Sequence, residues 1–161
     1  MSPFRSMSAA VTLCIAVAGA AQAQTATQTV TFRVNAISEI AVSGSPAPMV
    51  MDAPRGGGET NVTMGGTSYA ITTNEGNQKI VVALDRAMPT GVSLAVLLGA
   101  PSGGASHGSV ALSTRATDAV SSIPAGSARA LPIVYTLSAT DAARQGASGT
   151  RIVTYTIAAG L

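Results

Sequence analysis

The chain has 161 residues, with nine Lys or Arg, seven Asp or Glu and one His, and a net charge of +2 at pH 7. Only 10% of the residues are charged, and no basic run is present that could follow a phosphate backbone, which argues against nucleic acid as a partner. A single cysteine, Cys14, excludes an intrachain disulfide, and the length suits one domain.

Residues 1–23 have the features of a secretory signal peptide. Arg5 provides a positive charge, residues 9–21 form an apolar run, and Ala21-Gln22-Ala23 is a small-x-small cleavage site. The run is shorter than the about 20 apolar residues that a membrane-spanning helix needs. We therefore expect cleavage after Ala23, export to the periplasm, the cell surface or the medium, no membrane span after cleavage, and a single domain over residues 24–161.

Residues 29–36 alternate between apolar and polar side chains, which predicts a half-buried β-strand. The inward face of this strand would carry Val30, Phe32, Val34 and Ala36. The linking residues 37–39 contain no Gly or Pro that could act as a hinge. We therefore expect residues 29–36 to form an edge strand of the chain's own sandwich. Donation of this strand to a second copy is the alternative.

The next part of the chain combines short apolar sets with turn residues. Residues 40–42 are an apolar set, and residues 43–48 (SGSPAP) contain prolines, which lack the N–H that a central strand needs. This composition predicts a turn or a sheet edge. Residues 49–51 (MVM) predict a short strand before a loop at residues 53–59.

The middle and the end of the chain are typical of an antiparallel meander. Strands are expected at residues 67–73, 78–85, 92–98, 109–114, 131–139 and 150–158. Residues 99–108 predict a mobile loop, residues 115–130 show no clear pattern, and residues 140–146 predict one helical turn with Thr140 as N-cap and Gly146 as C-cap.

About eight short strands with short connections predict an all-β fold, because parallel strands need longer crossovers. An antiparallel, immunoglobulin-like two-sheet sandwich is the expected architecture, with a jelly roll or a small barrel as the alternative. Three segments share the order apolar-x-aromatic-x-aliphatic-x-Ala, namely residues 30–36, 133–139 and 153–159. Either the strands of one sandwich obey a common packing rule, or these segments are interchangeable partners for one groove.

No catalytic, cofactor-binding or metal-binding residue can be assigned, and we expect no cofactor and no enzymatic activity. His107 lies in a glycine-rich loop without a nearby acid or cysteine. Asp85, Asp118 and Asp141 fall at strand ends or in loops, where carboxylates shape turns. An EF-hand pattern is absent, which leaves only a loose calcium site between loops as an open alternative. The glycine-rich stretches lack the Lys-Ser/Thr of a phosphate-binding loop.

The export signal, the Thr-rich alternating strands and the final segment GTRIVTYTIAAGL resemble small exported bacterial β-sandwich proteins, such as the subunits of fimbriae and other surface filaments. The resemblance implies a structural or adhesive surface protein that acts through its sheet faces and edges. It also implies a pilin-like alternative, in which residues 29–36 complete a neighbour's sandwich. A soluble binding module that uses loops 53–66 and 99–108 is a further alternative. Many such pilins carry a cysteine pair, which this chain lacks.

Overall fold

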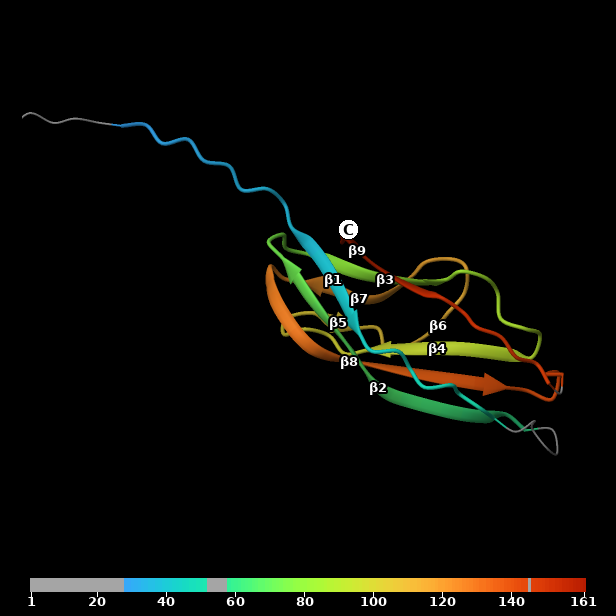
Figure 1. The fold of residues 1–161 in the computed structure, drawn as a ribbon. Helices are drawn as coiled ribbons and strands as arrows, with labels where there is room; N and C mark the ends of the chain where they lie inside the picture. The colour runs from blue at the N-terminus through green and yellow to red at the C-terminus, as the bar shows by residue number, and fades with distance from the viewer. Residues whose placement is uncertain (1–27, 52–57, 145) are drawn as a thin grey trace, which may run out of the picture. The chain divides into compact units, whose positions relative to one another are not determined.

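The computed structural model describes residues 28–51, 58–144 and 146–161, so the predicted signal peptide lies outside the described residues (Figure 1). Residues 34–161 form a compact unit of two antiparallel sheets. The predicted antiparallel two-sheet sandwich is therefore confirmed. The sheets remain separate, and each has its own free edges.

The first sheet has five strands and the second has four (Figure 1). The first has the order β1 (Ser38–Ser43), β2 (Thr60–Thr73), β8 (Gly126–Ala139), β4 (Val92–Leu98) and β6 (Ser109–Ala111). The second has the order β5 (Ala105–Ser106), β7 (Thr117–Ile123), β3 (Gln78–Leu84) and β9 (Val153–Ala159).

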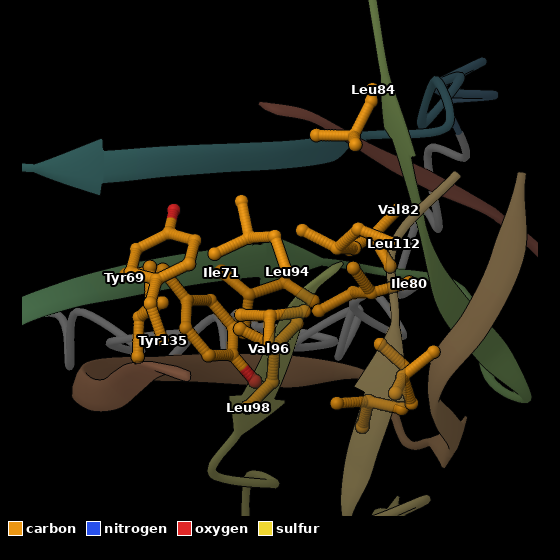
Figure 2. Packing of buried hydrophobic residues seen from close by; sticks show 14 of the residues in the cluster. Tyr69, Ile71, Ile80, Val82, Leu84, Leu94, Val96, Leu98, Leu112 and Tyr135 are labelled. Atoms are coloured by element: carbon orange, nitrogen blue, oxygen red, sulfur yellow. The ribbon is translucent and has the colours of Figure 1, made fainter. Parts of the chain in front are cut away.

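The core lies between the two sheets and follows from the period-two alternation of their strands. In β3 and β4 every second side chain is buried, and Ile80, Val96 and Leu98 are fully enclosed. Figure 2 shows apolar side chains from both sheets packed against one another. Tyr69 is buried with them, and its hydroxyl donates a 2.5 Å hydrogen bond to the carbonyl oxygen of Gly99. This bond satisfies the polar end of a core side chain.

β2 extends beyond its predicted segment and β7 was not predicted, because the alternation of both strands is interrupted. The register of β2 with β8 shifts between Met64 and Thr67, where Gly66 has a φ of +96°. Because of this bulge, the alternation does not run on from the predicted segment into the first half of β2, which begins at Thr60. In β7, Ala119 and Val120 are both fully buried although they are neighbours, so the strand shows no period of two.

Two smaller predictions are wrong. Residues 49–51 form no strand, because the preceding Pro46 and Pro48 cannot donate to a sheet and the chain leaves the ladder after Ser43. The predicted helical turn at residues 140–146 is instead a β-turn over residues 140–143, closed by a 2.9 Å hydrogen bond from the Ala143 N–H to the Thr140 carbonyl oxygen. No helix follows it in the described part of that segment.

The predicted edge strand at residues 29–36 is also wrong as a part of this sandwich. Residues 28–37 have no strand assignment, and β1 occupies the edge of the first sheet instead. The side chains of Val30, Phe32 and Val34 are 75%, 84% and 74% exposed. Alternation records that one face of a segment is apolar, but it does not say which molecule covers that face.

Candidate functional site

The outer edge of β9 is the longest free edge of the second sheet. β9 pairs with β3 over its whole length, from Val153 opposite Leu84 to Ala159 opposite Gln78. Its other edge pairs with no strand in the described part of the chain. The sequence of β9, VTYTIAA, contains neither a charge nor a proline. An edge of this kind exposes backbone donors and acceptors that another strand can use.

A groove of about 360 Å³ lies beside the first half of β9. It is bounded by β9, by the inner faces of β4 and β8, and by the residues that follow β1. Apolar and aromatic side chains line most of it, including Val42, Met49, Met88, Leu94, Tyr135 and Tyr155. β1 also contacts β9, and Val42 of β1 forms part of the groove lining.

Two tyrosines connect the sheets at the groove. Tyr135 of β8 and Tyr155 of β9 form a hydrogen bond between their hydroxyl groups. Burial raises the pKa of the Tyr155 hydroxyl above its ordinary value, and the hydrogen bond and the electrostatic influence of Tyr135 raise the pKa further. Both rings line the groove. The pair therefore links the edge strand to the opposite sheet.

A group of polar contacts fixes the position where β9 begins. Asp85 accepts a 2.9 Å hydrogen bond from the Ile152 N–H, and its own N–H donates to the Ile152 carbonyl oxygen at 3.0 Å. Arg86 and Arg151 both donate to the carbonyl oxygen of Thr150, at 2.8 Å and 3.0 Å. The pKa of the Asp85 carboxyl is lowered, mainly by the Ile152 N–H and then by Arg86. These contacts hold the edge strand in place without covering it.

Asn74 anchors the chain directly before β1. Its side chain donates to the Asn35 carbonyl oxygen and accepts from the Ile37 N–H, both at 2.7 Å. Its backbone N–H donates to the Ile37 carbonyl oxygen at 3.1 Å. The anchored part of the chain therefore begins at Asn35, and the exposed Val34 marks the end of the segment that these bonds leave free. The sequence offered no sign of this anchor, because Asn74 lies in a turn far along the chain.

Both segments that were predicted to be ligand-binding loops differ from that prediction in the structure. In loop 53–66, residues 60–66 belong to β2, and residues 53–57 lie outside the described residues. Loop 99–108 carries the short strand β5 and is fixed by several bonds. The Ser106 hydroxyl donates to the Leu98 carbonyl oxygen at 2.6 Å, and the His107 N–H donates to the Ala119 carbonyl oxygen at 2.9 Å.

The sequence did not predict the contact between His107 and Ser121. The Nε2 atom of His107 lies 3.0 Å from the Ser121 hydroxyl, which belongs to the segment without a clear pattern. A nucleophilic site also needs a group that orients the imidazole and donors for an oxyanion. Within the described residues, no other side-chain hydrogen bond involves the His107 ring, so this contact ties the loop to β7.

Asp118 forms an ion pair with Lys79 at 3.2 Å, and Asp141 lies in the turn after β8.

Within residues 28–51, 58–144 and 146–161, no three His, Cys, Asp or Glu side chains are grouped so that they could hold a metal ion. The same residues include no helix that is long and apolar enough to cross a membrane. Comparisons of the chain with protein-family models, with curated proteins and with solved structures found no match.

Proposed function

We propose that this chain is a non-catalytic, exported structural protein that assembles with copies of itself by strand exchange. Residues 29–36 of one copy would add to the free edge of β9 in the next copy, with their apolar face in the groove. One observation carries the proposal: the same chain has an amphipathic segment without a strand partner and a free strand edge beside an apolar groove. Addition of an extended segment to a sheet edge is a common mode of peptide recognition.

The chemistry of the two surfaces is compatible. The segment carries one charge, on Arg33, which the alternation places opposite the apolar face. β9 is uncharged, and Val42, Met88 and Leu94 give the groove an apolar lining. Residues 30–36 also share the residue order of β9, so both would present an aromatic side chain at the same place in the alternation.

The expected affinity is moderate. Burying the three exposed side chains Val30, Phe32 and Val34 contributes about 1.5–3 kcal/mol each. Association costs about 4–15 kcal/mol in lost freedom. Backbone hydrogen bonds to the β9 edge, at a net of about 1 kcal/mol each, must supply the remainder. Both the side chains and the strand ladder are therefore required, and the removal of either should abolish assembly at low protein concentration.

A complementation experiment tests the proposal with two disabled variants. The donor variant replaces Val30, Phe32 and Val34 by serine, and the acceptor variant Val42→Arg places a charge at the rim of the groove. Val42 is 44% exposed, so the fold should tolerate this change. Each variant alone should be monomeric in sedimentation velocity. An equimolar mixture should form a one-to-one complex, because the acceptor variant still donates a strand and the donor variant still has an open groove.

Ala41→Arg is the matched control, because Ala41 is exposed and lies on the opposite face of β1. This variant should assemble like the unchanged chain. Monomeric behaviour of the unchanged chain at all concentrations, or assembly of the donor variant alone, would contradict the proposal.

A further inference from the structure

Residues 44–51 run along the rim of the groove. Gly44, with a φ of +78°, turns the chain out of β1, and Gly44, Pro46 and Met49 all contribute to the lining. The Met49 side chain is partly buried and packs against the hydrophobic core. The chain's own residues thus occupy one side of the space in which a donated strand would have to lie.

These residues are held weakly. Pro46 and Pro48 have no N–H to donate, and β1 has already left the ladder at Ser43. In the described part of the chain, no backbone hydrogen bond outside the strands involves residues 44–51. Val50 is 80% exposed, which leaves the packing of Met49 as the main contact with the core. Segments with few buried contacts and unpaired backbone open at low free energy.

We propose that residues 44–51 form a strap that partly fills the groove in the isolated chain and withdraws when residues 29–36 of a second copy enter. This inference rests on the proposed strand exchange. The strap has two effects on assembly. It covers apolar surface that would otherwise be exposed beside a free edge, and it makes entry of the donated strand dependent on release of Met49. The prolines suit this role, because they lack an N–H and so prevent the strap from pairing permanently with the β9 edge.

Native methionines report on the strap directly. Met49 lies on the strap, Met88 lies in the loop between β3 and β4 and also lines the groove, and Met64 lies on β2 away from the groove lining. The experiment uses the full-length donor variant with a synthetic peptide of residues 28–36, and follows methionine oxidation by dilute peroxide with mass spectrometry. Peptide entry should make Met49 oxidise several-fold faster and Met88 several-fold slower, with Met64 unchanged. A peptide with Phe32→Ser is the control and should have little effect.

The possible outcomes separate the two proposals. Protection of both Met49 and Met88 would mean that the strap stays in place over the peptide, which overturns the strap and leaves strand exchange intact. No change at either methionine, together with no peptide binding by calorimetry, would overturn strand exchange and the strap with it.

A kinetic measurement adds an independent test. Met49→Ser should increase the rate of peptide binding several-fold, whereas Val50→Ser on the same strap should not, because Val50 is already exposed. An unchanged or lower rate for a folded Met49→Ser chain would show that Met49 supports the groove instead of blocking it, and would overturn the strap. Should Met49→Ser not fold, the oxidation of the unchanged Met49 still decides.

Discussion

Replacement of Phe32 by serine separates assembly from folding more sharply than any other single change. Phe32 is 84% exposed, so its removal deprives the isolated chain of almost no buried contact. In strand exchange the ring becomes buried in a second copy, which contributes about 2 kcal/mol. Since 1.4 kcal/mol corresponds to a tenfold change in an equilibrium constant, the variant should associate about 30-fold more weakly. Phe32→Leu should retain most of the affinity, because it keeps an apolar side chain of similar size.

Sedimentation velocity over a concentration series measures the association, and thermal unfolding of dilute samples measures the stability of the monomer. The melting temperature of Phe32→Ser should stay within about 2 °C of the unchanged chain, because exposed substitutions change stability by at most about 0.5 kcal/mol. Thr31→Ser, on the polar face of the same segment, serves as the control and should change neither quantity. A loss of about 3–5 kcal/mol in monomer stability would instead place Phe32 in a core of its own chain and refute the reasoning.

Three further predictions concern the sandwich itself. Tyr135→Phe and Tyr155→Phe should each lower the free energy of unfolding in urea by about 1–2 kcal/mol, and the double variant should lose less than the sum, because neither hydroxyl is then left without its partner. Burial raises the pKa of Tyr69 from 10 to about 12, so its contribution to stability is complete below pH 10 and is lost as the pH rises through 12. The Tyr69→Phe variant should therefore show a flatter decline of melting temperature between pH 9 and pH 12, and an equally steep decline would contradict this assignment. The pKa of Asp85 is lowered in the folded chain, so the ionised carboxylate stabilises the fold at a pH above its ordinary pKa of 3.8. This contribution is lost as the pH falls through the lowered pKa. Asp85→Asn should accordingly lower the melting temperature at pH 7 and converge with the unchanged chain near pH 2.

Regular alternation made most of the fold predictable. Residues 78–85 and 92–98 predict β3 and β4 almost to the residue, since each strand buries every second side chain. The first half of β2 was missed because a bulge at Gly66 shifts the register. β7 was missed for a similar reason, because Val120 and its neighbour Ala119 are both buried. Bulges are set by pairing across strands, and pairing is not visible in a single segment.

The groove could not be predicted from the sequence. Val42, Met88 and Tyr155 are far apart along the chain and meet only because β1 and β9 lie at the same side of the sandwich. The alternation marks residues 29–36 as amphipathic, but the structure has no strand there, so their expected place in the chain's own sandwich is wrong. The absence of Gly or Pro at residues 37–39 suggested a strand fixed to its own sheet. The bonds from Asn74 show instead that the chain is anchored at Asn35 and Ile37, so a strand that precedes this anchor needs no Gly or Pro hinge at residues 37–39.

The edges of the two sheets differ in how they are protected. β5 and β6, at one side, are only two and three residues long, which leaves little backbone for another strand to pair with. β1 carries Glu39, and the prolines of the strap follow it directly, both of which discourage pairing. β9 has seven residues and none of these features, although β1 contacts part of it. An uncharged edge of this length invites aggregation unless something specific covers it, and the only unpaired amphipathic segment among the described residues is 29–36. This segment also repeats the residue order of β9. The simplest arrangement that gives both the β9 edge and residues 29–36 a strand partner is therefore one in which residues 29–36 of one copy pair with β9 of the next.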